Sequence, residues 1–230
     1  EGIRSVNPNT LIFDAGDIFQ GTPYFNFFQG ELELKLMKEM GYNAATIGNH
    51  EFDTKSEAGE MYDRLFGGQF ADPSQRYNNL RFGPLFILML DSETDGNEYH
   101  KPKQKTWIEN QLKIASSNKE IKQILIAMHR PMFSLSKYFR KNYPAREALM
   151  PMLKKYGVKT VFCGHAHMYE HFDFEGIQFV VDGGAGAFLY SPDSKKEEAF
   201  AQWPALAKSR VFSSKSYGCS LIDVPLLSLK

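Results

Sequence analysis

Short apolar runs alternate with longer amphipathic segments along most of the chain. The apolar runs have the length of buried strands, and they lie at residues 10–13, 43–48, 85–90, 123–128 and 159–164. Segments with apolar residues at helical spacing separate them, at residues 30–41, 103–115 and 144–157. Strands that alternate with helices in this way predict a mixed α/β layered domain.

Glycine and proline mark where these elements end. Gly41 is predicted to stop the helix over 30–41, and Pro151 is predicted to kink or split the helix over 144–157. After residue 164 the pattern changes, because residues 169–182 alternate around Glu175-Gly176 like a β-hairpin. Two further predictions complete the pattern: a long surface loop at 191–216 and a strand at 218–224.

Length and charge limit the classes of function. A chain of 230 residues that is 43% hydrophobic is large enough for one full-sized core, so we predict a single domain over 1–230. The formal net charge is zero, which provides no basic field for nucleic acid or an anionic membrane. No apolar run approaches the roughly 18 residues of a membrane span. Cys163 and Cys219 form neither a disulfide framework nor a CxxC metal site.

Polar groups that can bind metals directly follow four of the apolar runs. In α/β sheets, ligand sites gather outside the carboxyl ends of the strands, so these groups are expected to meet at one edge. They are Asp17 after "LIFDAGD", Asn49 and His50 after "ATIGNH", His129 after "LIAMH", and His165 and His167 after "VFCGHAH".

Each of these motifs also has an ordinary structural interpretation. A Gly-Asp pair at a strand end is usually a turn, and a single histidine such as His129 is usually hydrogen-bonded locally. The "GHAH" motif is more specific, because His165 and His167 point to one face of an extended segment and Gly164 permits close backbone approach. The joint pattern, in which four segments distant in sequence carry such groups, favours a metal site.

The donor types indicate which metals the site would hold. Nitrogen and oxygen ligands without thiolate suit zinc, manganese or iron rather than calcium or copper(I). Asp17 is a carboxylate that can bridge two ions about 3.5–4 Å apart. Such a pair would grip a phosphate and lower the pKa of a bound water, while His50 gives a proton to the leaving group and Asp53 orients its ring.

The quoted motifs resemble those of the calcineurin-like metallophosphoesterases. "GD" (16–17), "GNHE" (48–51), His129 and "GHAH" (164–167) follow the order of that family over nearly the whole chain. The N-terminal part is similar to the catalytic domain of 5′-nucleotidases and UDP-sugar hydrolases. The C-terminal part looks more like purple acid phosphatases.

This resemblance implies a fold and a role for each residue. The fold would be the family's four-layer α/β/β/α sandwich, holding two divalent or trivalent ions of zinc, manganese or iron. Asp17 would bridge the ions, Asn49, His129 and His165 would complete one site, and His167 would belong to the other. His50 and Asp53 would be the pair that supplies the acid or contacts the phosphate.

Two positions differ from the purple acid phosphatases, and one motif of the whole family is missing. Gln20 stands where purple acid phosphatases have tyrosine, as in nucleotidases, so no iron–tyrosinate colour is expected, and His171 stands where purple acid phosphatases commonly have arginine. The family's Asp-x-His motif, on a strand before residue 10, is not in the sequence. The domain is therefore expected to be N-terminally incomplete and to lack its first strand.

The leading hypothesis is metal-dependent hydrolysis of a small phosphate ester, with monoesters favoured and nucleotides left open. One alternative is a catalytically impaired, metallophosphoesterase-like binding module that lacks the Asp-x-His ligands. Another is a plain α/β scaffold, which predicts that His129, His165 and His167 lie apart. Both branches of the resemblance are mostly exported, which favours an extracytoplasmic location, and the sequence leaves the oligomeric state open.

Overall fold

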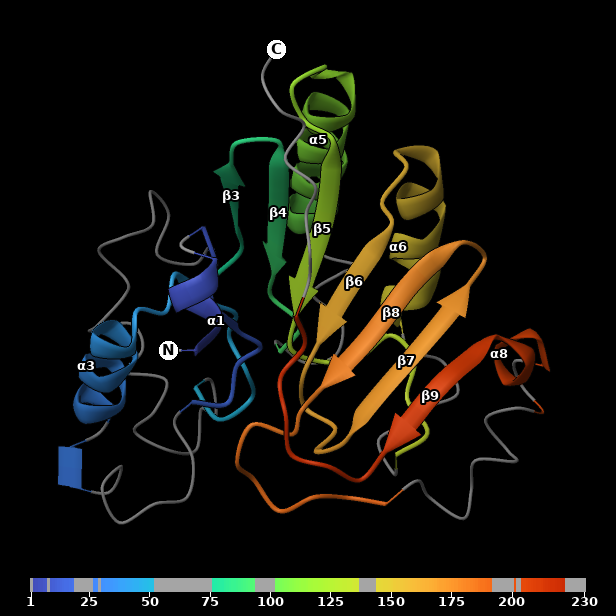
Figure 1. Ribbon diagram of the computed structural model, residues 1–230. Coiled ribbons are helices and arrows are strands. Elements are labelled where there is room, and N and C mark those ends of the chain that lie inside the picture. The colour runs from blue at the N-terminus through green and yellow to red at the C-terminus, as the bar shows by residue number, and fades with distance from the viewer. Residues whose placement is uncertain are drawn as a thin grey trace.

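The computed structural model describes residues 2–7, 9–18, 27–28, 30–51, 76–93, 102–136, 144–191, 201 and 204–221. Their helices and strands form a mixed α/β fold with a seven-stranded and a two-stranded sheet (Figure 1). The elements are α1 (Gly2–Val6), β1 (Phe13–Asp14), α3 (Glu31–Met40), β2 (Ala44–Ala45), β3 (Asn78–Phe82), β4 (Leu85–Leu90), α5 (Pro102–Ser117), β5 (Gln123–Met128), α6 (Pro144–Lys155), β6 (Thr160–Cys163), β7 (Tyr169–Phe174), β8 (Ile177–Asp182), α8 (Pro204–Ser209) and β9 (Arg210–Ser214).

The strand order of the large sheet is β3-β4-β5-β6-β8-β7-β9. The strands β4, β5, β6 and β8 run parallel to one another, whereas β3, β7 and β9 are antiparallel to their neighbours. In the small sheet β1 and β2 are also parallel. The loops that follow β5 and β6 therefore leave the large sheet at the same edge, which is where the sequence predicted the site.

Helices α5 and α6 cover one face of the large sheet (Figure 1). The predicted apolar side of α5 is confirmed, because Ile108, Leu112 and Ala115 are buried in the main hydrophobic core. This core also contains Leu88 of β4 and Ile126 of β5, both fully buried. The parallel strands are thus held rigidly from behind, which fixes the positions of the loops at their ends.

The opposite face of the large sheet carries a smaller core. Leu85 and Ile87 of β4 form it together with Leu125 of β5. Phe13 of β1 packs against this cluster and meets the ring of Phe82 edge-on, with 6.0 Å between the ring centroids. Phe13 thus places the small sheet against this face, α3 lies to the side of the large sheet where β3 forms the edge (Figure 1), and the predicted layered α/β class is confirmed.

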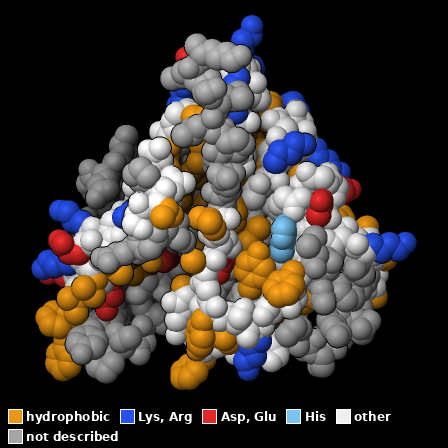
Figure 2. Space-filling view, viewed as in Figure 1, with side chains coloured by type: hydrophobic (Ala, Val, Ile, Leu, Met, Phe, Trp, Pro, Cys, Tyr) orange, Lys and Arg blue, Asp and Glu red, His pale blue; other side chains and the backbone are white. Residues whose placement is uncertain are grey.

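Hydrophobic side chains also remain visible on this second face in the space-filling view (Figure 2). The apolar stripe predicted for α3 is part of this exposed surface, since Leu36 and Met40 are 51% and 55% exposed. None of the described residues of α3 is buried. The second face is therefore packed less completely than the face under α5 and α6.

The predicted ends of two helices have different outcomes. Gly41 ends α3 as predicted, in a left-handed conformation with φ 76°, and its N–H donates to the carbonyl of Lys38. The predicted split at Pro151 is wrong, because α6 continues through this residue. Pro151 and Glu147 are both exposed, so water can reach the Glu147 carbonyl that loses its N–H donor.

Three predictions near the sheet edges need correction. The loop predicted at 191–216 is wrong for 204–214, which form α8 and β9, and β9 pairs with β7. The strand predicted at 218–224 is wrong for 218–221, which are not in a strand, while 222–224 lie outside the described residues. Strand β3 was not predicted. Both β3 and β9 are edge strands, where exposed positions accept polar residues and the apolar pattern is weak.

Two further observations bear on the expected class of protein. No helix among the described residues is long and apolar enough to cross a membrane. Cys163 is buried at the end of β6, and burial raises the pKa of its thiol to about 12. This cysteine is therefore a core residue that stays protonated at neutral pH.

Candidate metal centre

The loops that follow β1 and β2 are packed backbone against backbone. A Cβ atom on Gly16 would lie 2.6 Å from the nitrogen of Gly48, and one on Gly48 would lie 2.3 Å from the nitrogen of Asp17. Only glycine fits at these two contacts. The buried carboxylate of Glu51 joins the loops, because its Oε2 accepts N–H bonds from Gly48 (2.7 Å) and Asp17 (2.8 Å).

Asp17 occupies an unusual backbone conformation at this junction. Its φ is 67°, and His165 has a φ of 63°, both in the left-handed region that non-glycine residues seldom adopt. Such residues concentrate at functional sites, where the surrounding structure enforces them. The N–H of His50 donates to Asp17 Oδ1 at 2.9 Å, which leaves Oδ2 directed at His129.

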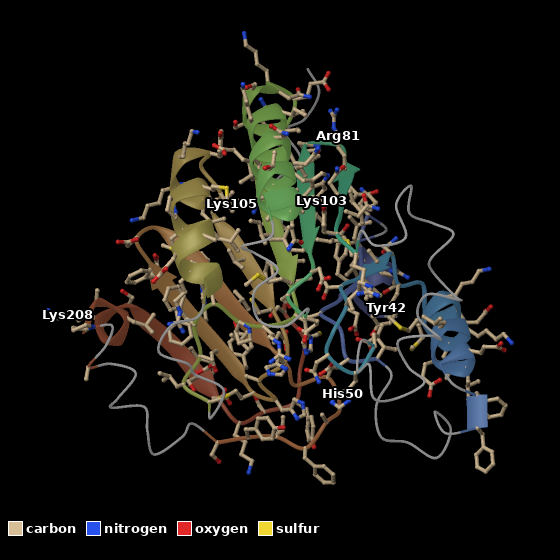
Figure 3. The ribbon with its side chains drawn as sticks, turned by 180° about the vertical axis from the view of Figure 1, so that it is seen from behind. Tyr42, His50, Arg81, Lys103, Lys105 and Lys208 are labelled. Carbon is tan, nitrogen blue, oxygen red and sulfur yellow. The ribbon has the colours of Figure 1, made fainter. Side chains whose placement is uncertain are left out.

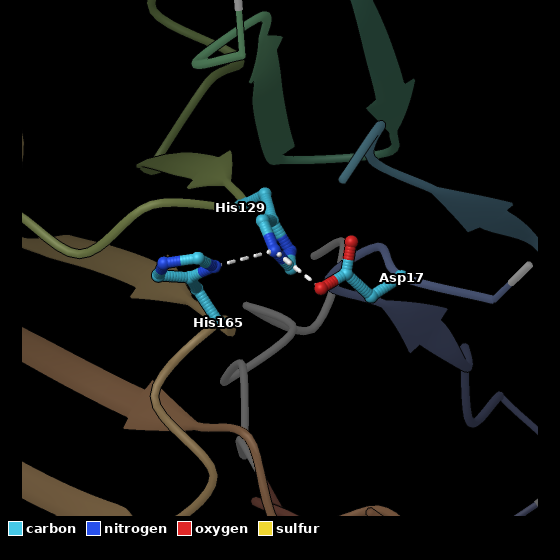
Figure 4. Close-up of side chains that lie close together, drawn as sticks. All are labelled: Asp17, His129 and His165. Atoms are coloured by element: carbon cyan, nitrogen blue, oxygen red, sulfur yellow. Dashed lines mark hydrogen bonds and ion pairs between the residues drawn. The ribbon is translucent and has the colours of Figure 1, made fainter. Parts of the chain in front are cut away.

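The ring of His129 is completely buried and oriented by a backbone carbonyl. Its Nδ1 lies 2.7 Å from the carbonyl oxygen of Ala15, so this nitrogen must carry the proton that is donated. In the neutral ring Nε2 then presents a lone pair. Nε2 lies 3.0 Å from Asp17 Oδ2 and 3.1 Å from His165 Nδ1, as the dashed lines of Figure 4 mark.

These contacts bring together the donors of a candidate metal site. One ligand atom each from Asp17, His129 and His165 lies within 4.8 Å of the other two. Asn49 Oδ1 is also buried, and it has no hydrogen-bond partner among the described residues. Leaving such an oxygen unsatisfied costs about 1–3 kcal/mol, which a bound cation would offset. The donors therefore fit a metal ion that prefers nitrogen and oxygen ligands.

Electrostatics keeps two of these ligands in their metal-binding forms. Burial raises the pKa of Asp17, but the hydrogen bond and charge of His129 and the N–H of His50 outweigh it and lower the pKa to about 2. Burial, with the charges of His129 and Arg130, lowers the pKa of His165 to about 3. Burial also lowers the pKa of His129, but Asp17 and Glu93 outweigh it and the net shift is upward. A metal ion would therefore compete with a proton for Nε2 of His129.

His167 has a different environment. It is not in the group of three donors found among the described residues. Its Nδ1 lies 2.9 Å from the carbonyl oxygen of Phe188, and its ring stacks on Tyr190 with 4.4 Å between centroids and 9° between planes. The bond to the carbonyl leaves Nε2 as the nitrogen with a lone pair, the pattern commonly seen in histidine ligands.

The predicted acid pair is only partly described. His50 lies near the strand ends (Figure 3), and its backbone contacts Asp17, but Asp53 lies outside the described residues. The pairing of His50 with Asp53 thus stays a prediction. The scaffold hypothesis, in which the histidines lie apart, is contradicted for His129 and His165.

Sequence reasoning assigned no role to three charged residues beside the site. Glu51 bridges the two loops, as described above. Arg130 contacts Glu93 Oε2 through Nε (2.9 Å) and Nη2 (2.8 Å), and its Nη1 lies 3.3 Å from His165 Nε2. Burial raises the pKa of Glu93 despite the opposing charges of His129 and Arg130. The available signal was position, because Glu93 and Arg130 follow the ends of β4 and β5 as closely as the predicted ligands do.

Comparison with known proteins agrees with this geometry. Residues 1–169 match the calcineurin-like phosphoesterases. The trifunctional nucleotide phosphoesterase protein YfkN of Bacillus subtilis is 36% identical over 107 residues, which are 46% of this chain and 7% of that protein. The 5′-nucleotidase of Diplobatis ommata is 44% identical over 57 residues, 25% of this chain and 10% of that protein. The chain thus matches only a small part of the length of these relatives.

Two solved structures share the fold. A purple acid phosphatase from yellow lupin seeds has a TM-score of 0.70 at 18% identity, covering 94% of this chain and 42% of that one. A dimetal phosphatase from Danio rerio has a TM-score of 0.53 at 16% identity, covering 78% of this chain and 74% of that one. The match over residues 1–169 confirms the resemblance seen in the motifs, and the chain belongs to the calcineurin-like phosphoesterases.

Proposed function

We propose that the protein hydrolyses phosphate esters, monoesters before diesters, in a metal-dependent reaction. The observation that carries the proposal is the convergence of Asp17 Oδ2, His129 Nε2 and His165 Nδ1. The unsatisfied Asn49 Oδ1 supports it, because a buried amide oxygen of this kind suits a cation.

The proposed metal centre holds two ions of zinc, manganese or iron. Asp17, Asn49, His129 and His165 would hold one ion, and Asp17 and His167 would contribute to the second. Bound metal supplies positive charge to the phosphate oxygens and makes a water molecule more acidic. We also propose that residues 1–230 form a single catalytic domain.

The remaining residues hold the centre and move protons. Glu51 fixes the backbone of Asp17 through the N–H bonds described above, so the carboxylate stays directed at His129. The backbone N–H of His50 donates to Asp17, which places His50 beside the centre. Its imidazole would donate a proton to the leaving oxygen of the substrate. Asp53 would orient the His50 ring.

The organic half of the substrate is left open between simple esters and nucleotides. Nucleotide substrates are supported by the names of the relatives, a nucleotide phosphoesterase and 5′-nucleotidases. An extracytoplasmic location is supported by the snake venom 5′-nucleotidase of Gloydius brevicauda, which is 47% identical over 51 residues.

Hydrolysis of 4-nitrophenyl phosphate tests the proposal. Activity should disappear after metal is stripped with a chelator and return with zinc or manganese. His50→Ala should lower kcat by about 10²–10⁴-fold, the usual contribution of a positioned acid, without changing metal content. His171→Ala is the control, because its ring contacts Gln178 across the β7–β8 hairpin.

The outcomes separate the hypotheses. Full activity in a metal-stripped sample would exclude a metal-dependent reaction. One ion or none per chain by native mass spectrometry, together with no turnover, would favour the catalytically impaired binding module.

A further inference from the structure

Arg130 is a charged residue beside the candidate centre that the proposed reaction does not yet use. It directly follows His129, and its side chain lies between buried Glu93 and the ring of His165. The Arg130 side chain is 29% exposed, whereas that of Glu93 is 1% exposed. The Arg130 side chain is therefore partly open to solvent beside the proposed metal ligands, while its partner carboxylate is buried.

Glu93 occupies one side of the guanidinium. Its Oε2 accepts bonds from Nε and Nη2 of Arg130, and its Oε1 accepts the hydroxyl of Ser92. Ser92 Oγ in turn accepts the backbone N–H of Arg130. This arrangement fixes the direction of the side chain and leaves Nη1 on the side of the centre, 3.3 Å from His165 Nε2.

The contact between Nη1 and His165 depends on which ring nitrogen carries the proton. A guanidinium only donates hydrogen bonds, so His165 Nε2 must accept, and the ring proton must then sit on Nδ1. Nδ1 is the atom that faces His129. If His165 uses the lone pair of Nδ1 to bind a metal, Nε2 carries the proton and two N–H groups face each other. Arg130 Nη1 then needs another acceptor.

We propose that this acceptor is a nonbridging oxygen of the substrate phosphate, with Glu93 as the positioning residue for Arg130. The inference rests on the proposed function and adds the residue that selects the substrate class. Guanidinium groups match phosphate oxygens in charge and geometry. A monoester has three nonbridging oxygens and a diester has two, so an additional donor favours the monoester. With a net charge of zero, the chain must hold the phosphate by local cations of this kind.

Phosphate binding to the zinc-loaded protein tests the assignment. Arg130→Gln should raise the Kd of inorganic phosphate, measured by calorimetry, by about 10- to 100-fold. Zinc affinity, measured by competition with a chromophoric chelator, should stay within about threefold. Arg130→Lys should recover part of the phosphate affinity, because it restores the charge without the planar fork.

Arg81→Gln is the matched control. Arg81 also pairs with a glutamate, Glu120, and it lies at the opposite end of the fold from His50 (Figure 3). Arg81→Gln removes the same charge as Arg130→Gln, but at a site remote from the candidate centre. It should therefore leave the Kd of phosphate unchanged.

Substrate preference gives a second readout. Arg130→Gln should lower kcat/KM for 4-nitrophenyl phosphate at least tenfold more than for bis(4-nitrophenyl) phosphate. An unchanged phosphate Kd with zinc bound would overturn the assignment, as would a parallel loss of zinc affinity, which would make Arg130 a residue that positions His165. If the unmodified protein binds none of zinc, manganese and iron, the proposed function itself fails, and this inference fails with it.

Discussion

The two sides of the candidate centre are built to different degrees. On the Asp17 side, which comprises Asp17, Asn49, His129 and His165, donor atoms converge and a buried amide oxygen has no partner among the described residues. On the His167 side, the imidazole contacts Phe188 and Tyr190 and does not join that group. The described residues thus prepare the first side for a cation more completely than the second.

The same device orients the histidine on both sides. His129 donates Nδ1–H to the carbonyl of Ala15, and His167 contacts the carbonyl of Phe188 through the same ring atom. The difference lies in what the other nitrogen faces, because His129 Nε2 has Asp17 beside it. Both carbonyls belong to segments distant in sequence, so the tertiary structure already orients each imidazole, and the two sides differ in the further donors that surround the ring.

Removing one histidine from each side should give the largest contrast. His129→Ala should weaken binding of the tighter zinc ion by at least about 100-fold, since loss of even an outer partner costs about 10–100-fold. His167→Ala should change the Kd of that ion by less than about threefold and should weaken the binding of a second ion only. Zinc titration against a competing chelator measures both constants. Equal losses in the two variants would show that the sides are equivalent.

A glycine-to-alanine substitution on each side should have an intermediate effect on stability. Gly48→Ala forces a Cβ against the backbone of Asp17, and Gly183→Ala forces one to 2.1 Å from the carbonyl oxygen of Ala166. Each should lower the free energy of unfolding by about 1–3 kcal/mol in urea denaturation. Gly48→Ala should also weaken the tighter zinc ion, because it displaces Asp17.

Gly218→Ala is the control for these variants, since no atom of the described residues beyond its chain neighbours lies within 4 Å of its added Cβ. It should change neither the stability nor the zinc affinity. Retention of full zinc affinity by Gly48→Ala would contradict the role given to the Gly16–Gly48 contact.

The smallest difference between the two sides should appear in how stability depends on acid pH. In chelator, the unfolded chain protonates His165 near its ordinary pKa of 6.5, whereas the folded pKa is about 3. Stability from this group is therefore complete above pH 6.5 and falls as the pH is lowered, by about 1 kcal/mol between pH 6 and 5. The raised pKa of His129 acts in the other window, where stability falls as the pH rises above 6.5.

Urea midpoints at pH 6 and 5 measure this effect. His165→Asn should flatten the decline, while His167→Asn should keep it. The raised pKa values of Asp14 and Glu93 oppose the decline, but both carboxyls are present in the two variants. The same slope in both variants would exclude His165 as its source.

Prediction from sequence succeeded where a local pattern reflects burial. The strands β4 and β5 were predicted with their observed bounds, because continuous apolar runs suit strands buried by α5 and α6. The edge strands β3 and β9 were missed, because exposure removes that pattern. In the same way, the donors at Asp17, His129 and His165 were visible as polar residues that directly follow apolar runs.

The pairing of Glu93 with Arg130 could not be predicted in this way. Glu93 follows β4 and Arg130 follows β5, and only the parallel pairing of these strands places their ends side by side. Glu51 had a motif but no visible role, because its partners are backbone N–H groups that any sequence would carry.

The sequence by itself determined which segments become strands and which donors stand at their ends, because burial and turn geometry act over a few residues. Only the tertiary structure decided which donors meet. Asp17 reaches His129 because β1 docks on the face of β4 and β5 and because Gly16 and Gly48 allow two backbones to touch. His167 remains apart because its ring is held by Phe188 and Tyr190, contacts that depend on where a distant loop packs.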